Sequence, residues 1–444
     1  MSENQMLRSL GLKEALALVV GSVIGTGVFL KAGIMANQVG SGYWVLAAFI
    51  VSGLLSLCGA LCYAELGSLF PRAGGEYVFL REAYGETLSF LYGWTRFWIG
   101  SPASIAAYSV GAVTFLSGVI AFKSPIGQSL AAIALIWVFS LVNCLSVAFG
   151  GKFQAMLTVL KILMILGLTL AIFGFGRDAS WSHLTSQTGA WPGLSAFGAA
   201  MIGALWAYDG WNNMPMVAGE IRNPSRNIPI ALAMGMGIVL ILYLLANLSY
   251  FYALPASEIA NAYSRLHPEA LPVATLAATR AFGSIAAVVL SIAFVISAVG
   301  AMNGSILTNA RVPYAMAQDK LFFHGLSQLS KAHRVPVVSI LVQAIVSSAL
   351  ALSGSFDQLT DYVVFASWIY YALGCGSIFI FRRRGLKADY RVPLYPWLPM
   401  FFIVSAIFLL INTLMTSPRE SLTGLAFMII GIPFYLFFKK AKQT

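Results

Sequence analysis

The chain has 444 residues, of which 59% are hydrophobic and only 10% are charged, and its formal net charge is +11. Soluble domains carry roughly a quarter of charged residues, so this composition excludes a soluble enzyme, a disordered chain and a nucleic-acid-binding protein. The basic residues lie in short loops between long apolar runs, as in the cytoplasmic loops of membrane proteins. All four cysteines fall inside apolar runs, from which we expect no disulfide, metal site or cofactor.

Twelve runs are long enough to cross a bilayer, because a spanning helix needs about 20 predominantly apolar residues. They are 12–36, 43–70, 87–120, 127–147, 152–174, 191–219, 228–253, 281–317, 335–354, 358–382, 395–416 and 420–438. The sequence therefore predicts an all-α integral membrane protein with twelve transmembrane helices. The stretch 254–280 contains three prolines and is predicted to be a loop with short helices. Residues 1–11 are polar and predict a tail without a removable signal.

The basic residues predict the orientation. With the N-terminus in the cytoplasm, nineteen Lys and Arg lie on that side, six lie outside and two lie within spans. The six outside residues are Lys31, Lys123, Arg177, Arg265, Arg280 and Arg419. By the positive-inside rule, we expect a multi-pass protein of the plasma (inner) membrane, with both termini, including the tail 439–444, in the cytoplasm.

Two of the runs contain helix-weakening segments. The first run has Gly21, Gly25 and Gly27 within seven residues, and the sixth contains the Gly-rich and polar stretch 203–212. Transport folds often consist of inverted halves whose first helices are both broken near the midplane. Because an offset of five helices inverts topology, we expect 12–174 and 191–382 to form a 5+5 inverted repeat, with 395–438 as two extra helices.

The glycines of the first run permit two interpretations. Gly21 and Gly25 form a small-xxx-small pair that would favour close helix packing. Pairing with a second interruption favours a broken helix instead, whose free N–H groups near Thr26 and Gly27 would attract a carboxylate. Free carbonyls near 21–24 and 206–209 would attract an ammonium group. The two segments together therefore suit an α-amino acid.

Two charged residues lie deep in predicted spans. Asp209 could attract the substrate ammonium, bind a coupling proton, or cap broken backbone through nearby N–H groups. Lys161 lies about ten residues into its run, near 15 Å along a helix, which is a long distance for a side chain to snorkel. We therefore expect Lys161 to be buried, either as a proton carrier or as a fixed cation where a metal ion could otherwise sit.

Three further residues have less specific interpretations. Arg96 lies at similar depth in the third run, and we expect it to form an ion pair or to snorkel, without a substrate role. The Trp206 ring could close over a ligand, but on pattern alone an ordinary core-facing or lipid-facing aromatic is favoured. Glu65, near the end of the second run, is expected to be a structural ion-pair partner.

Several motifs carry a resemblance to a known family. They are VGSVIGTGVF (20–29), YAELG (63–67), PRAGGEY (71–77), WAYDGWN (206–212), GEIRNP (219–224) with RNIP (226–229), and NGS (303–305) followed by Ala310 and Arg311. With these motifs the chain resembles the amino acid–polyamine–organocation (APC) superfamily. It is most similar to the L-type amino acid transporter branch that includes bacterial serine/threonine exchangers.

The resemblance implies a LeuT-like fold of five plus five inverted helices with two extra, working by alternating access. It also implies a set of substrate contacts in the two broken segments. The carboxylate contacts are Gly25, Thr26 and Gly27; the ammonium contacts are the carbonyls of Ile24, Trp206, Ala207 and Asp209; Asn212 completes the set.

Two residues take further roles from the resemblance. Lys161 matches a lysine that resembles a substitute for bound sodium in sodium-independent relatives. Trp206 takes the position of an aromatic gate, where many L-type relatives carry Phe and arginine/agmatine-type relatives carry Trp.

We expect a secondary active transporter, not an enzyme, which moves neutral L-amino acids by sodium-independent exchange or proton-linked uptake. A cationic amino acid or polyamine antiporter is the main alternative, kept open by Asp209 and Trp206. A membrane enzyme or a sensor on the same scaffold is a further alternative. The expected partners are the amino acid substrate and the lipid bilayer, and no nucleic acid. Animal L-type members pair with a glycoprotein through a cysteine near helix three; the loop 121–126 has none, so no such subunit is expected.

Overall fold

The computed structural model describes residues 8–117, 120, 122, 124–145, 147–176, 178–185, 191–330, 333–353 and 356–443. Three basic residues used for the orientation, Lys123, Arg177 and Lys331, lie outside the described residues, as do residues 1–7 of the predicted tail and Ala121 of the loop 121–126. Within the described ranges the regular elements are helices, as predicted, accompanied by two isolated β-bridges.

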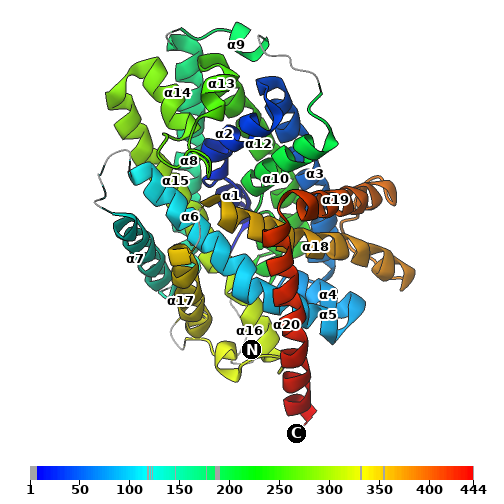
Figure 1. Cartoon of the computed structure of the whole chain (residues 1–444). Coiled ribbons are helices and arrows are strands. Elements are labelled where there is room, and N and C mark those ends of the chain that lie inside the picture. Colours follow the sequence, from blue (N-terminus) through cyan, green and yellow to red (C-terminus); the bar gives the residue numbers. More distant parts are fainter. Residues whose placement is uncertain are drawn as a thin grey trace.

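The helices follow one another along the whole chain (Figure 1). They are α1 (Leu12–Val23), α2 (Gly27–Val39), α3 (Gly42–Leu69), α4 (Glu76–Tyr84), α5 (Glu86–Thr95), α6 (Ser101–Leu116), α7 (Pro125–Asn143), α8 (Val147–Phe175), α9 (Ser182–Thr185), α10 (Leu194–Ala207), α11 (Asn213–Met216), α12 (Pro224–Ala253), α13 (Ala256–Ala260), α14 (Val273–Phe282), α15 (Ser284–Asn309), α16 (Arg311–Gln318), α17 (Val337–Ser353), α18 (Phe356–Arg383), α19 (Trp397–Thr416) and α20 (Pro418–Gln443). Short 3₁₀ turns lie at Ala218–Glu220 and His324–Ser327.

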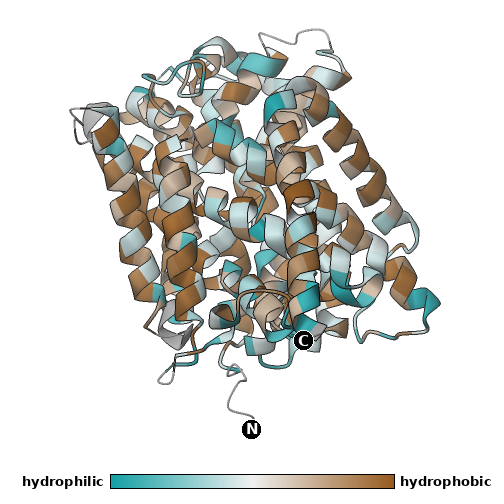
Figure 2. Cartoon of the chain, turned by 60° about the horizontal axis from the view of Figure 1, so that its bottom comes forward, coloured by the Kyte–Doolittle hydropathy of each residue, from teal (hydrophilic) through white to brown (hydrophobic). Residues whose placement is uncertain are grey.

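The predicted spans are confirmed as apolar helices. Within the described residues, ten helical stretches are long and apolar enough to cross a membrane, and α10 and α17 are shorter apolar helices in the sixth and ninth runs. Figure 2 shows hydrophobic residues along the flanks of the long helices. The stretch 254–280 holds α13 and α14, as expected for a loop with short helices. The chain is therefore a multi-pass membrane protein.

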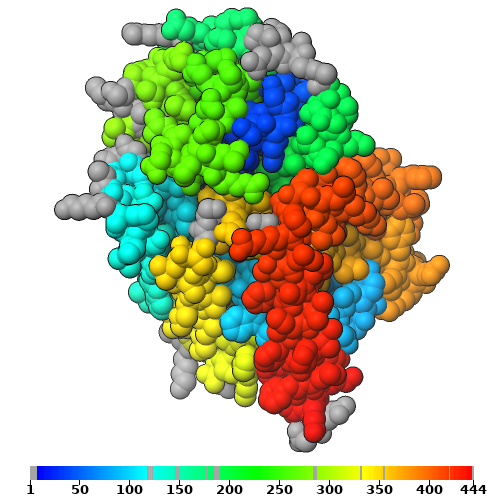
Figure 3. Space-filling model, in the orientation of Figure 1, coloured from blue at the N-terminus to red at the C-terminus, as the bar shows by residue number. Residues whose placement is uncertain are grey.

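The helices differ in how much of their surface is buried. In the span Leu12–Val39, 94% of the most apolar window is buried, and in Glu86–Leu116 83% is buried. In Pro125–Asn143 only 17% is buried, and in Ser421–Lys442 only 28%. The first and third spans therefore form the centre of the bundle, whereas α7 and α20 pack on its outside, where α20 forms part of the front surface (Figure 3).

Both predicted helix breaks are present. The first span stops at Val23 and restarts at Gly27, and Ile24 between them has an extended backbone. The sixth run stops at Ala207, and after the irregular residues 208–212 only the four-residue α11 follows. The run 191–219 is thus not one long interrupted helix, since its second part is short and turns away. Gly210, with φ +117°, provides the left-handed backbone that this turn requires.

An unpredicted irregularity occurs in the third span. A π-helical turn at Arg96–Gly100 separates α5 from α6, and the N–H of Ser101 bonds to the carbonyl of Arg96. The cause is Pro102, which has no N–H to continue the α-helical ladder. The wider turn places the Arg96 side chain in the centre of the bundle.

Two ion pairs, one partly buried and one fully buried, join separate elements. Glu65 accepts hydrogen bonds from Arg382 at 2.7 and 3.0 Å, which confirms its expected structural role. Glu220 pairs with Arg311 at 2.9 and 3.3 Å, and the two side chains are only 1% and 0% exposed. The second pair joins the segment after α11 to the start of α16.

We predict that Glu220→Gln destabilises the protein by about 3–5 kcal/mol, because the Arg311 charge is left buried without a counter-charge. Thermal unfolding of the purified protein in detergent measures this. Glu82→Gln is the matched control, because the Arg72–Glu82 pair is 57% and 39% exposed and such pairs contribute about 0–1 kcal/mol. Equal melting temperatures for the two variants would contradict the prediction that the Glu220–Arg311 pair stabilises the protein more than the exposed Arg72–Glu82 pair.

Candidate functional site

The two breaks lie directly against one another. A Cβ added to Gly27 would sit 2.5 Å from Cα of Ala207, and one added to Gly210 would sit 2.9 Å from the carbonyl oxygen of Ser22. A Cβ on Gly21 would overlap the Thr158 side chain, and one on Gly25 would lie 2.7 Å from Tyr108 Cε1. The packing interpretation of these two glycines therefore holds beside the broken-helix interpretation. Gly27 lets the N-terminus of α2 approach the C-terminus of α10, and a larger residue there would disturb packing before it disturbed any ligand.

Lys161 satisfies part of the broken backbone of the first span. Its Nζ donates to the carbonyls of Gly21 at 2.8 Å and Ile24 at 2.7 Å. The side chain is fully buried, which confirms the burial predicted for Lys161 and rules out snorkelling. A lysine amine thus occupies the place between the end of α1 and the break, where free carbonyls were predicted.

Tyr243 of α12 joins the two breaks, and the sequence analysis missed it. Its hydroxyl lies 2.8 Å from the carbonyl oxygen of Val23 and 2.9 Å from that of Ala207. A phenol has one proton, so it donates to one of these oxygens at a time. A single tyrosine in the apolar run 228–253 gives no spacing signal, and only its distant partners reveal its position.

Unpartnered polar atoms concentrate at the breaks. Of the nineteen buried side-chain N and O atoms without a hydrogen-bond partner in the described structure, five belong to residues 22–26 and 206–212. They are Ser22 Oγ, Thr26 Oγ1, Trp206 Nε1, Tyr208 OH and Asn212 Oδ1. Thr26 is the N-cap of α2 and makes no capping bond, so this helix N-terminus retains its attraction for an anion.

Asp209 lies in the second break and is almost completely buried, with 6% exposure. The hydroxyl of Tyr371 donates to its Oδ1 at 2.7 Å. Tyr371 comes from α18, and its ring packs on Trp211 at 4.9 Å. The carboxylate is therefore held in place from outside its own segment, an arrangement compatible with each of the three roles considered for Asp209.

Trp206 belongs to a layer of aromatic rings and does not face lipid. It is 2% exposed, and its ring centre lies 5.3 Å from that of Tyr108 and 6.2 Å from that of Phe356. Phe356 begins α18 and also lies beneath the amine of Lys31, 4.9 Å from ring centre to Nζ. The aromatic layer thus connects the second break with a cluster of charged residues.

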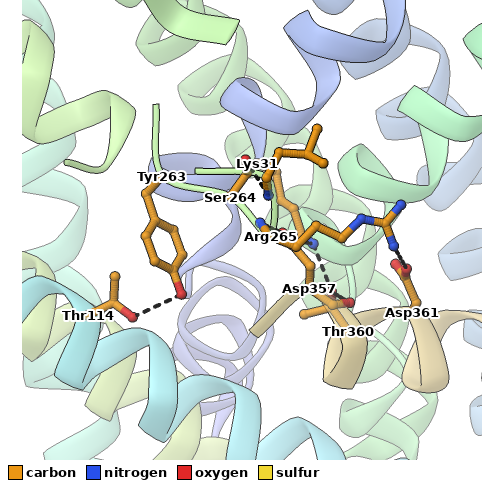
Figure 4. A network of polar contacts seen from close by, with 9 residues as sticks. Lys31, Thr114, Tyr263, Ser264, Arg265, Asp357, Thr360 and Asp361 are labelled. Carbon is orange, nitrogen blue, oxygen red and sulfur yellow. Dashed lines mark hydrogen bonds and ion pairs between the residues drawn. The ribbon is translucent and has the colours of Figure 1, made fainter. Parts of the chain in front are cut away.

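This cluster joins α2, the segment after α13 and the start of α18, and α13 and α14 lie at the upper end in Figure 1. Lys31 Nζ donates to Asp357 Oδ1 and to Thr360 Oγ1, both at 2.7 Å, and Figure 4 shows its amine directed at this pair. The backbone N–H of Arg265 donates to the other oxygen of Asp357 at 2.8 Å. Lys31 was counted among the outside residues, but it is 2% exposed within α2. It therefore belongs to the buried structure.

The expectation for Arg96 was wrong. Its guanidinium is 4% exposed and makes no ion pair within the described residues. It donates to Asn309 Oδ1 at 2.9 and 3.2 Å, to Asn213 Oδ1 at 3.2 Å and to Ser367 Oγ at 3.4 Å. Neutral oxygens from three separate elements satisfy this charge, which the sequence could not show because they are distant along the chain.

The structure brings most of the predicted substrate contacts together. Residues 24–27, 206–209 and Lys161 surround the junction of the two breaks, as the contacts above show. Asn212 lies at the far end of the second break, where its Nδ2 is 3.4 Å from Glu76 Oε2. Glu76 was predicted only as part of a motif.

Comparison with known proteins shows the family of the chain. The chain matches the amino acid permease family over residues 10–438. It is 32% identical to the serine/threonine exchanger SteT of Bacillus subtilis, with 100% of this chain and 99% of that protein aligned. It is 30% identical to the human b(0,+)-type amino acid transporter 1, covering 97% of this chain and 88% of that protein. It is also 26% identical to the human cystine/glutamate transporter, covering 98% and 86%. On its broken helices and on this full-length match, the chain belongs to the amino acid permease family.

Proposed function

We propose that the protein is a secondary active transporter of neutral L-amino acids, working without sodium by exchange or proton-linked uptake. One observation carries the proposal: two broken helices meet inside the bundle, beside an uncapped helix N-terminus and several unpartnered buried polar groups. Such a junction offers donors for a carboxylate and acceptors for an ammonium group a short distance apart. The printed functions of SteT and the b(0,+)-type transporter support the amino acid class.

In the proposed binding mode, the substrate carboxylate meets the backbone at Gly25, Thr26 and Gly27. The ammonium meets acceptors of the second break and the Ile24 carbonyl. Since Ile24 already accepts from Lys161, it has one lone pair left for a ligand.

The proposed transport cycle depends on the contacts of Lys31 and of the Trp206 ring. Opening the upper end requires separation of Lys31 from Asp357 and displacement of the Trp206 ring. We therefore propose that this ion pair breaks and that the ring moves when the substrate enters or leaves. We propose further that 12–174 and 191–382 are inverted repeats and that 395–438 are accessory helices. The proposed location is the plasma membrane with both termini in the cytoplasm. The protein is proposed to act without enzymatic activity and without a glycoprotein subunit.

Lys161 is proposed to take the place of a sodium ion, because its amine holds two carbonyls of the first break as a cation would. The cationic amino acid or polyamine alternative is not favoured, since SteT, which aligns with the whole chain, is a serine/threonine exchanger.

Uptake by purified protein in liposomes tests the proposed function. We expect radiolabelled L-serine or another neutral amino acid to enter in sodium-free buffer. Exchange requires an internal amino acid, whereas proton-linked uptake requires an inward proton gradient. Liposomes without the protein are the control. Absence of uptake for a full panel of amino acids, with and without internal substrate, would refute the proposal.

The hydroxyl of Thr26 provides a more specific prediction. Thr26→Val removes an unpartnered buried hydroxyl, so the melting temperature should be unchanged or higher, while KM for the amino acid rises about three- to tenfold through loss of a ligand contact. Thr275→Val is the matched control, because Thr275 Oγ1 is also buried and unpartnered but lies in α14. An unchanged KM in Thr26→Val would show that the Thr26 hydroxyl does not contact the substrate.

Lys161→Ala should reduce transport at least about tenfold, because two carbonyls of the first break lose a charged donor. Initial rates between pH 5 and 8 measure the effect and its proton dependence. Lys152→Ala, an exposed lysine of the same helix, should behave as wild type. Kinetics of Lys161→Ala that match wild type over this pH range would leave Lys161 with a scaffold role only.

A further inference from the structure

Glu76 is a buried carboxylate for which the proposed function has no role so far. It is 0% exposed, and no cation lies within ion-pair distance of it in the described part of the chain. Two hydroxyls donate to it instead: Tyr63 OH lies 2.6 Å from Oε1 and Tyr92 OH lies 2.8 Å from Oε2. The third donor is Nδ2 of Asn212, at 3.4 Å from Oε2. Burial of such a carboxylate costs free energy, which points to a functional role for Glu76.

The backbone on both sides of the Glu76–Asn212 contact is fixed. Gly74 and Gly75 have φ of +111° and +51° and turn the chain immediately before Glu76. The N–H of Gly74 donates to the carbonyl of Met216 at 3.0 Å, and a Cβ on Gly75 would lie 2.9 Å from the backbone nitrogen of Met216. The loop that carries Glu76 thus packs against α11, whose N-cap position is Asn212.

The chemistry of the pair determines how the Asn212 amide is turned. Both oxygens of Glu76 accept hydrogen bonds from tyrosine hydroxyls, and Asn212 Nδ2 lies 3.4 Å from Oε2, whereas the amide has one donor end and one acceptor end. The nitrogen of Asn212 therefore faces Glu76, and the oxygen faces away from it. That oxygen is buried and has no partner among the described residues, a state that costs free energy unless a ligand completes it.

Four backbone acceptors of the two breaks already lie within hydrogen-bond distance of a side-chain donor. Lys161 occupies the carbonyls of Gly21 and Ile24, and Tyr243 lies within hydrogen-bond distance of those of Val23 and Ala207. Every α-amino acid brings an ammonium group with three N–H donors, which need acceptors when they leave water. The free oxygen of Asn212 is such an acceptor.

We propose that Glu76 is a positioning residue, which holds the Asn212 amide so that its oxygen, not its nitrogen, receives a hydrogen bond from the bound amino acid. This inference rests on the proposed function, amino acid binding at the two breaks. Glu76 itself does not touch the substrate, and Tyr63 and Tyr92 hold its carboxylate in turn.

The test compares Glu76→Gln, Asn212→Ala and the double variant in liposomes, with L-serine and L-alanine as substrates. A glutamine at position 76 can offer its own NH₂ group, so the Asn212 amide can turn and present nitrogen to the substrate. We expect KM to rise about tenfold in Glu76→Gln, with the maximal rate within about twofold of wild type. In the double variant KM should equal that of Asn212→Ala alone, because Glu76 acts through Asn212.

Two results would overturn the inference: an unchanged KM in Glu76→Gln, or the same further rise when Glu76→Gln is added to Asn212→Ala. An equal effect on both substrates supports it and assigns the contact to the ammonium, and an effect on serine alone supports it and assigns the contact to the side-chain hydroxyl. If Glu76→Gln does not fold, Tyr92→Phe replaces it. We expect KM to rise about threefold there, and an unchanged KM would refute the positioning role. A wild-type protein that transports no amino acid would instead refute the proposed function.

Discussion

A peptide group that leaves a helix inside a bilayer has no water to bond with, and this constraint governs the centre of the structure. Both breaks leave backbone groups without their helical hydrogen bonds, and side chains from distant helices bond to some of these groups. Lys161 donates from its amine to the carbonyls of Gly21 and Ile24, and the Tyr243 hydroxyl lies within hydrogen-bond distance of the carbonyls of Val23 and Ala207. What remains unpartnered, above all at the N-terminus of α2 and at Asn212, is where a zwitterion can add its own hydrogen bonds.

The same constraint explains how the other buried charges are arranged. Two of these charges are paired directly with a counter-charge, Glu220 with Arg311 and Lys31 with Asp357. Near the junction, Arg96 and Glu76 are surrounded by amides and hydroxyls instead. Both arrangements join separate elements, but a hydrogen bond to a neutral partner costs less free energy to break than a buried ion pair. This difference suits a centre that must change shape around a substrate.

The sequence was sufficient for the broad architecture and for part of the site. Twelve apolar runs correspond to apolar helices because spanning length and composition are local properties, and the breaks were predicted because glycine weakens a helix wherever it occurs. The burial of Lys161 followed from its depth in a run, and the pairing of Glu65 from its place at the end of one.

The remainder depends on contacts between residues far apart in the chain. Tyr243 and Ala207 meet through the packing of α12, and the neutral partners of Arg96 come from three other elements. No periodicity signals such contacts. The short second part of the sixth run was also missed, since the left-handed turn at Gly210 depends on its close approach to Ser22 in the other break.

The central claim is that exposed peptide groups of the two broken helices bind the amino acid. A cryo-electron microscopy map of the protein with saturating L-serine measures this most directly. The account predicts density for the amino acid between the start of α2 and residues 206–212, with its carboxylate in hydrogen-bond reach of the backbone at Thr26 and Gly27. Serine bound elsewhere in the bundle, or α1 and α2 joined as one continuous helix in the bound protein, would contradict it.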